Sequence, residues 1–423
     1  MIKALAIFLL TYVLLMALPK YRAYIALASA ALFVILGILP LNEVFSVVNW
    51  NVIMMIAGTM GVVYFFIESK MPALLADVII QKMPNMKWAI IALSLFAGII
   101  SAFVDNVATV LMVAPVALTI SKKLNASPVN SIIAISISAN LQGAATLVGD
   151  TTSILLGGYA ELDFLDFFVC RGRPGMFWVV EISAIAATLV LMVVLRKENQ
   201  KIKLGFRAEV TDYFPTVMLL GTVVLLILAS FIKNKPENTN GYICMALFII
   251  CLIRETVRGK GLNGVREALK SVDYFTLCLL IGLFIVVAGI TKAGVVDAIA
   301  GLFVKISGNN IFAMYSLIVW ASVLLSAFID NIPYVATMLP VVSGIAALLD
   351  VNPTLLYFGL LSGATLGGNL TPIGASANIA GLGILRKEGY DVSTGKFMKI
   401  SVPFTLSAVI TGYLLVWFIW CRY

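Results

Sequence analysis

The sequence contains no histidine and little charge. Of its 423 residues, 12% are Asp, Glu, Lys or Arg, whereas 61% are hydrophobic. Without imidazole, histidine proton relays, His-ligated metals and Ser-His-Asp catalysis are excluded. A water-soluble chain could not bury so large a hydrophobic share, so lipid must be the solvent for most of it. We therefore expect an all-α polytopic membrane protein embedded in a lipid bilayer.

Cysteine is also scarce and forms no motif. The five cysteines, Cys170, Cys244, Cys251, Cys278 and Cys421, show no CxxC spacing, and four of the five stand in or beside apolar runs. Small buried side chains account for them, so we expect neither a disulfide framework nor a metal centre. The chain also offers no nucleophile–base pair and no soluble domain large enough to bind a nucleotide. We expect no enzyme activity and no cofactor.

Apolar runs predict a series of membrane spans. They lie near 3–18, 23–40, 51–69, 130–156 and 177–195 in the first half, and near 214–232, 241–253, 274–291, 354–380 and 400–420 in the second. The N-terminal run lacks a cleavage site and is interpreted as a retained span. Two further apolar stretches, 86–121 and 311–349, are each interrupted by an Asp-Asn pair. The polar segment 196–212 is the predicted cytoplasmic linker between 1–195 and 213–423.

The two halves are repeats. A shift of 225 residues aligns 85–154 with 310–379 without a gap. The matched positions include Asn85 with Asn310, Asp105-Asn106 with Asp330-Asn331, Pro115 with Pro340, Gly143 with Gly368, Thr146 with Thr371, and Gly149 with Gly374. Chance rarely keeps so many Gly, Pro and polar residues in register, so each half is expected to build the same unit.

Basic residues gather in alternate loops, which predicts the orientation of the chain. If each half makes five crossings plus one hairpin that enters and leaves on one side, most of the 29 Lys and Arg fall inside and the N-terminus outside. The net charge of +8 then sets topology and does not indicate nucleic-acid binding. Because five is odd, the second half runs inverted relative to the first, an arrangement typical of secondary transporters.

The Asp-Asn pairs are the first candidate site. Only 15 residues separate Asn106 from Lys122, too few for a full crossing, so 86–121 and 311–349 are predicted to be re-entrant hairpins. A carboxylate at such a buried tip is costly unless it is paired, protonated or holding a cation. The alternative is a polar turn in which Asp caps the next helix.

A second polar patch interrupts the spans 130–156 and 354–380. Glycines beside Thr146 and Thr371 are expected to break each helix within the membrane. The break frees carbonyls for a cation and leaves a helix N-terminus that favours an anion. The alternative is close packing of helices through small residues. The candidate substrate- and ion-binding residues are Asp105, Asn106, Asn140, Thr146, Gly149, Asp150, Thr151, Asp330, Asn331, Asn369, Thr371, Gly374, Ser376 and Asn378.

The charged residues predicted near the membrane midplane favour a coupling cation. Asp105, Asp150 and Asp330 are the predicted midplane carboxylates, and we expect no Lys or Arg beside them. An anionic substrate would then be held by helix N-termini, amides, hydroxyls and a bound cation. A sodium site is possible at Asp105, Asn106, Asp150, Asp330 and Asn331, but carboxylates serve protons equally well.

Four motifs resemble the ion-transporter superfamily over essentially the whole chain. "FVDNVATVLMVAP", "GAATLVGDTTSI", "FIDNIPYVATMLPVV" and "LGGNLTPIGASANIAG" are similar to motifs of the arsenite-permease and melanosomal P-protein branch. The superfamily also includes sodium/proton antiporters and divalent-anion:sodium symporters. The resemblance implies hairpin-tip roles for both Asp-Asn pairs, and broken-helix roles for Gly149, Asp150, Gly374, Ala375, Ser376 and Asn378. It also implies an elevator-type transport domain, a static scaffold and a homodimer.

These observations predict an ion-coupled secondary active transporter in a bacterial or archaeal inner membrane. Its expected substrate is a small anion or oxyanion-type solute, arsenite/antimonite or a carboxylate, moved with sodium or protons. A sodium/proton antiporter is the first alternative and an anion channel the second. A carrier saturates and responds to the coupling ion, whereas a channel does neither.

Overall fold

The computed structural model describes residues 1–124, 126–201, 208–308 and 310–421, and for residues 259–262 the backbone alone. Residues 202–207 of the predicted linker therefore lie outside the described residues. The helices of the first half are α1 (Ile2–Ala17), α2 (Arg22–Ile35), α3 (Val44–Val47), α4 (Trp50–Glu68), α5 (Met71–Gln81), α6 (Met86–Ser101), α7 (Asn106–Lys123), α8 (Val129–Gly143), α9 (Thr151–Ala160) and α10 (Met176–Val194). A short hairpin of β1 (Val169–Cys170) and β2 (Arg173–Pro174) precedes α10.

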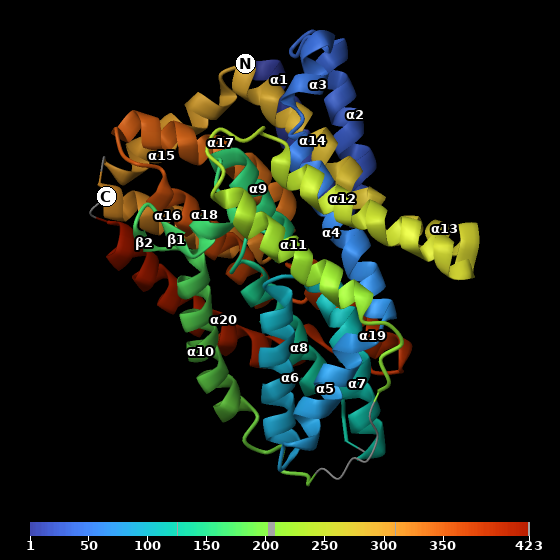
Figure 1. The fold of residues 1–423 in the computed structure, drawn as a ribbon. Coiled ribbons are helices and arrows are strands. Elements are labelled where there is room, and N and C mark those ends of the chain that lie inside the picture. The colour runs from blue at the N-terminus through green and yellow to red at the C-terminus, as the bar shows by residue number, and fades with distance from the viewer. Residues whose placement is uncertain (125, 202–207, 309, 422–423) are drawn as a thin grey trace.

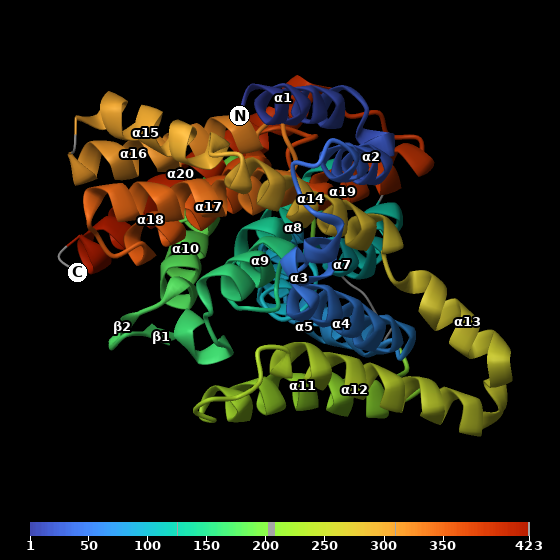
Figure 2. The same ribbon diagram turned by 90° about the horizontal axis from the view of Figure 1, so that it is seen from above.

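The second half is built in the same order. Its helices are α11 (Phe214–Ser230), α12 (Thr239–Glu255), α13 (Gly261–Ser271), α14 (Tyr274–Lys292), α15 (Val295–Ser307), α16 (Ile311–Ser326), α17 (Asn331–Leu349), α18 (Thr354–Leu361), α19 (Ser376–Lys387) and α20 (Thr394–Trp420). A π-helical turn, Ser362–Leu366, follows α18. Figures 1 and 2 show that α13 projects from the body of the molecule between α12 and α14.

Within the described residues, six helices are long and apolar enough to cross a membrane: α4, α10, α12, α14, α17 and α20. Two sharply bent pairs pass the same test together, α1 with 19–35 and α15 with α16, at angles of 116° and 118°. An all-helical membrane protein is therefore confirmed. The helix α17, predicted as one leg of a hairpin, is among the six, so length alone does not distinguish a re-entrant leg from a span.

Side-chain caps fix where the helices of each half begin. Asn85 accepts a hydrogen bond from the Trp88 amide at the start of α6, and its repeat partner Asn310 does the same for α16. Capping satisfies amides that a helix's first turn leaves without backbone partners. Asn85 and Asn310, which the 225-residue shift aligns, thus also make the same hydrogen bond.

Glycines let the long helices of the two halves pack closely across the molecule. A Cβ on Gly282 of α14 would lie 2.6 Å from the backbone of Ala26 in α2. A Cβ on Gly58 of α4 would lie 2.4 Å from the backbone of Cys244 in α12. The backbones of α14 and α2 are therefore in close contact, and so are those of α4 and α12. Each pair joins one helix from each half (Figures 1 and 2).

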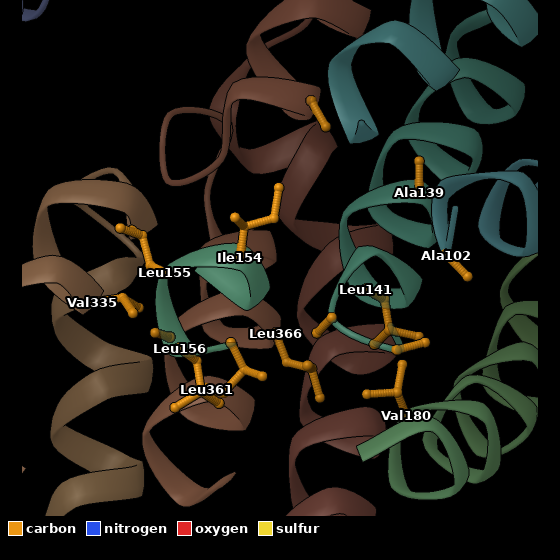
Figure 3. Packing of buried hydrophobic residues seen from close by; sticks show 14 of the residues in the cluster. Ala102, Ala139, Leu141, Ile154, Leu155, Leu156, Val180, Val335, Leu361 and Leu366 are labelled. Atoms are coloured by element: carbon orange, nitrogen blue, oxygen red, sulfur yellow. The ribbon is translucent and has the colours of Figure 1, made fainter. Parts of the chain in front are cut away.

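The hydrophobic core also joins the halves beneath the polar patches. Leu155 and Leu156 of α9 are buried between Val335 of α17 and Leu361 of α18 (Figure 3). The helix that follows the first broken segment is thus held by the second hairpin. Large exposed side chains such as Leu220 and Leu228 on α11 lie on the outer surface, as expected where lipid is the solvent.

Candidate functional site

Both predicted broken helices lose regular α-helix inside the molecule. The helix α8 ends at Gly143 and α9 begins at Thr151, so 144–150 is non-helical backbone between them. In the second half α18 passes into the π-helical turn, and α19 begins only at Ser376. All the residues from 144 to 150 are buried. Non-helical backbone at membrane depth is tolerated only where protein or a polar cavity satisfies it.

The broken segments are fastened to the hairpin tips by one contact that occurs twice. The Thr146 hydroxyl donates to the carbonyl of Ala102, and the Thr371 hydroxyl donates to the carbonyl of Ala327. The hydrogen-bonding residues are 44 positions apart in each half. The two threonines are therefore structural links between tip and broken helix.

Gly149 and Gly374 let the backbone of each broken segment pack directly against the backbone of a hairpin tip. A Cβ on Gly149 would lie 2.6 Å from the Ser101 carbonyl oxygen, and one on Gly374 would lie 2.7 Å from that of Ser326. Real Cβ atoms essentially never come so close to backbone oxygen. Only glycine lets the chain pass the hairpin here, so both glycines serve close packing.

A cavity of about 320 Å³ lies where the two hairpins and the two broken helices meet. We call it the tip cavity. It is lined by Met60, Val63, Tyr64 and Ile67 of α4, by Asp105, Asn106, Val107, Ala108 and Leu111, by Asp150 and Thr151, by Ser271, Asp273 and Thr276, and by Asn331, Ile332 and Ser376. The first residue of four helices is in this lining: Asn106 of α7, Thr151 of α9, Asn331 of α17 and Ser376 of α19. Four helix N-termini thus converge on one cavity.

Three carboxylates and no Lys or Arg line the tip cavity among the described residues. Asp105 is half-buried and accepts hydrogen bonds from the Val107 and Ala108 amides. Asp150 is 3% exposed and accepts from the Thr152 hydroxyl at 2.6 Å. Asp273 is exposed and caps α14. The lining combines negative side chains with the positive ends of helices.

Amides connect this cavity to the interior. The Asn106 amide nitrogen donates to Asn140 Oδ1 at 3.0 Å and lies 3.5 Å from Asp150 Oδ1. Asn140 in turn donates to the Thr365 carbonyl at 2.8 Å and to Asn369 Oδ1 at 3.1 Å. Hydrogen bonds therefore run from the first tip into the second broken helix and tie the halves together.

The expectation that no Lys or Arg lies beside the midplane carboxylates is wrong. Arg22, at the first position of α2, places Nη1 3.0 Å from Asp330 Oδ2, and the two side chains are only 11% and 7% exposed. The sequence offers a reason for the error, because Arg22 flanks an apolar run as loop arginines do. In the structure α1 and α2 meet at a sharp bend that brings Arg22 inward.

The structure separates the predicted residues into groups. Asp105, Asn106, Asp150, Thr151, Asn331 and Ser376 line the tip cavity, and Asp330 lies behind it, against Ser376 and Arg22. Asn140, Thr146, Asn369, Thr371 and Asn378 hydrogen-bond buried backbone, while Gly149 and Gly374 pack against it. Of the five possible sodium ligands, Asp330 alone is outside the lining. Sequence reasoning missed Arg22, Asp273 and Thr365.

A family model described as "CitMHS: Citrate transporter" matches residues 12–361, which is most of the chain. The chain belongs to the CitMHS citrate transporter family. It is accordingly a secondary transporter, and its predicted resemblance to the ion-transporter superfamily is confirmed. The family and its relatives are transporters, consistent with the expectation that the chain is no enzyme.

Relatives and solved structures agree with this family. An uncharacterized transporter of Mycobacterium tuberculosis is 32% identical over 99% of this chain and 98% of its own length. The P protein of Mus musculus is 28% identical over 92% of this chain and 56% of its own length. The YdaH transporter of Alcanivorax borkumensis shares the fold, with a TM-score of 0.60 at 14% identity over 95% of this chain and 98% of that one. The MtrF structure of Neisseria gonorrhoeae also shares the fold, with a TM-score of 0.56 at 16% identity over 89% of this chain and 83% of that one.

Proposed function

We propose that this CitMHS-family chain is a cation-coupled carrier of a small carboxylate anion. One observation carries the proposal: four helix N-termini and three carboxylates share the tip cavity. Helix N-termini present free amides and a positive dipole end, which bind anions. Carboxylates without a basic neighbour bind a cation or a proton. A cavity that offers both suits an anion and a cation carried together.

Asp105 and Asp150 are the proposed cation ligands. Both line the cavity, and the side-chain amide nitrogen of Asn106 lies 3.5 Å from Asp150 Oδ1. Carboxylate, amide and hydroxyl oxygens are the ligands that hard cations prefer. A bound sodium ion or proton would lower the negative charge that otherwise repels an anion from this cavity.

The anion is proposed to bind at the N-termini of α9 and α19. Thr151 and Ser376 are the first residues of these helices, and each offers a hydroxyl and backbone amides to the cavity. The family description names citrate, which favours a carboxylate over arsenite or antimonite as the substrate class. The expected substrate is therefore a carboxylate that the cation helps to neutralise.

A second cavity supports alternating access by inverted repeats. This cavity, the opposite cavity, has a volume of about 480 Å³ and is lined by Asn49, Phe284, Val287 and Thr291 among others. Asn49 and Asp273 cap α4 and α14 and stand 224 positions apart, as do Ile67 and Thr291. Equivalent residues thus line both cavities, but none of the candidate site residues lines the opposite one.

We therefore propose an elevator-type cycle in which the hairpins and broken helices move past α4 and α14. Ser271 and Asp273 line the tip cavity and directly follow the basic segment 254–270, which forms the end of α12, a π-helical turn and α13. The charge bias predicts that this segment is cytoplasmic. In the proposed cycle, this arrangement is the state in which the site faces the cytoplasm. Movement of the hairpins would bring the same site to the opposite cavity. A homodimer, an inner-membrane location and an external N-terminus remain proposals from the resemblance and the charge bias.

The test is uptake of radiolabelled citrate into proteoliposomes, with a sodium gradient, a pH gradient or neither. Saturable uptake that needs one gradient, and is competed by other carboxylates, is the expected result. Sodium-for-proton exchange without anion uptake would instead identify an antiporter. Uptake that neither saturates nor depends on a gradient would identify a channel. Arsenite is included as a competitor to decide between the two substrate classes.

A further inference from the structure

We propose that Arg22 acts as a built-in competitor for a second sodium site at Asp330. In this structure the guanidinium occupies the position that a sodium ion would take beside the carboxylate. Sodium binding must then displace Arg22, so the cost of breaking this ion pair sets the sodium affinity of the second hairpin. The inference rests on the proposed cation coupling and deepens it, because it adds a second cation site and a residue that controls it.

The geometry holds the guanidinium on one oxygen of Asp330. Arg22 Nη1 donates to Asp330 Oδ2 at 3.0 Å, and Arg22 Nε donates to the Leu15 carbonyl at 3.2 Å. The end of α1 thus aims the guanidinium at the hairpin tip. Ser376 Oγ donates to the same Oδ2 at 3.0 Å, while Oδ1 accepts from the Ile332 amide.

The groups around Oδ2 form a cation site apart from Arg22. Asp330 is 5% exposed and Ser376 supplies a hydroxyl oxygen that can turn its lone pairs towards an ion. Asn331 is 3% exposed, lines the tip cavity, and its Nδ2 atom has no hydrogen-bond partner among the described residues. The carboxylate and hydroxyl oxygens lie 3.0 Å apart at this buried point, and the proposed site would take the side-chain oxygen of the neighbouring Asn331 as a third ligand. Such an oxygen set suits a hard monovalent cation.

The cavity gives sodium a route to this site. Asn331 and Ser376 line the tip cavity, whereas Arg22, which reaches the carboxylate from α2, is not among the residues that line it. An ion arriving from the cavity therefore meets the hydroxyl and the amide before the guanidinium. Arg22 can then retreat towards Leu15, to which it already donates a hydrogen bond.

The ion pair also crosses between parts that the proposed cycle moves apart. Arg22 belongs to α2, which lies on the long helix α14, whereas Asp330 is the tip of the second hairpin. Tyr12 of α1 adds a hydrogen bond to the Pro333 carbonyl at 2.6 Å. The pair must break whenever the hairpin leaves α2, and a sodium ion on Asp330 would replace the lost charge. Buried charge would otherwise be left without compensation.

The test compares the sodium dependence of thermal stability in the parent and in Arg22→Gln. Purified full-length protein is titrated with sodium chloride, and choline chloride keeps the ionic strength constant. We expect Arg22→Gln to melt below the parent without sodium, and to reach half-maximal stabilisation at a sodium concentration at least tenfold lower. Stabilisation by a ligand follows its concentration relative to Kd, so the midpoint reports affinity.

Three further variants keep the result interpretable. Arg22→Gln combined with Asp330→Asn should lose the high-affinity response. Arg254→Gln, which removes the ion pair to Asp212 outside the hairpins, should leave the sodium midpoint unchanged. Arg22→Lys keeps a charge without the planar fork of donors and should give an intermediate midpoint. This last variant also carries the test if Arg22→Gln does not fold.

Two results would overturn the inference. Equal sodium midpoints in the parent, Arg22→Gln and Arg22→Lys would show that Arg22 does not compete with sodium. A tighter midpoint that survives Asp330→Asn would place the sodium elsewhere. Failure of the proposed function looks different, since gradient-dependent uptake would then be absent in the parent, whatever the sodium midpoint of the Arg22 variants.

Discussion

The tips of the two hairpins differ in what their aspartates bind. Asp105 accepts hydrogen bonds from two backbone amides and faces the tip cavity, where no basic side chain is described. Asp330 caps its helix in the same way but also binds Arg22 and Ser376. Capping, the simpler interpretation of both, is therefore true of both and explains neither the cavity at one tip nor the ion pair at the other.

The equivalent positions at the two tips have diverged in charge balance while keeping their backbone geometry. At the first tip no Lys or Arg lines the cavity beside the carboxylate among the described residues, whereas the second tip receives a cation from the chain itself, the Arg22 guanidinium. Identical substitutions at the two tips should therefore have different consequences.

The largest expected effect is loss of transport in Asp105→Asn. Asparagine caps helices as well as aspartate, so the fold should be retained while the negative charge is removed. We expect gradient-driven uptake to fall to background with a melting temperature near that of the parent. Asp297→Asn, which alters an exposed carboxylate of α15 that does not line the tip cavity, is the matched control. Parent-like uptake in Asp105→Asn would reduce this residue to a cap.

Asp330→Asn should destabilise the fold as well as impair uptake. The substitution leaves the Arg22 guanidinium buried without its partner, and breaking a buried pair in this way costs about 3–5 kcal/mol. We expect a clear fall in melting temperature that a second substitution, Arg22→Gln, partly reverses. Thermal unfolding of both single variants and the double variant measures this coupling. Additive effects of the two substitutions would mean that the pair contributes little.

Gly374→Ala should disturb the second broken helix by a smaller amount. The added Cβ would lie 2.6–2.8 Å from three carbonyl oxygens of the backbone, so the chain must shift. Overpacking of this kind costs about 1–3 kcal/mol. Gly149→Ala should behave alike, since its surroundings are equivalent. Gly383→Ala is the control, because Gly383 lies in α19, the helix that follows the second break, and a Cβ there would meet nothing within 4 Å. Similar melting temperatures for all three would contradict the prediction.

The smallest expected effect is at an ion pair outside the membrane. Arg254 hydrogen-bonds Asp212 and lowers the pKa of that carboxyl. Its contribution to stability is therefore present at neutral pH and is lost as the pH falls through the lowered pKa. Asp212→Asn should cost no more than about 1 kcal/mol, as partly exposed pairs do. The difference in melting temperature from the parent should be constant from about pH 8 to about pH 5 and shrink below that range. If Asp212→Asn lowered the melting temperature as much as Asp330→Asn does, burial would not explain the difference between the two ion pairs.

Sequence patterns predict the parts of this site that break the hydrophobic background. Asp105, Asp150 and Asn331 are polar residues within apolar runs, and the 225-residue shift identifies their partners. Composition and the repeat therefore predict the long helices, the two breaks and six of the residues that line the cavity. The same logic fails for Arg22 and Asp273, because each stands at the end of an apolar run, where charge is ordinary.

Other features depend on packing that no local pattern contains. The Thr365 carbonyl accepts from Asn140 because the two halves meet there, although neither residue's neighbours in sequence indicate the contact. The sharp bend between α1 and α2 likewise decides whether Arg22 lies in a loop or inside the molecule. The missed residues depend on how helices of different halves pack, whereas the predicted residues are recognisable from their own stretch of the sequence.

Asn140 and Thr365 occupy the same position in the two halves, and they touch each other. Two equivalent positions can meet only where the axis relating the halves passes between them. In an assembly of two identical half-length chains, one residue type would face itself at that point. Here one side donates through an amide and the other accepts through its backbone. The centre of the molecule is thus asymmetric in its hydrogen bonding. Asn140 also donates to Asn369, whose equivalent in the first half is Ala144, so a second copy of the first half would lack this acceptor.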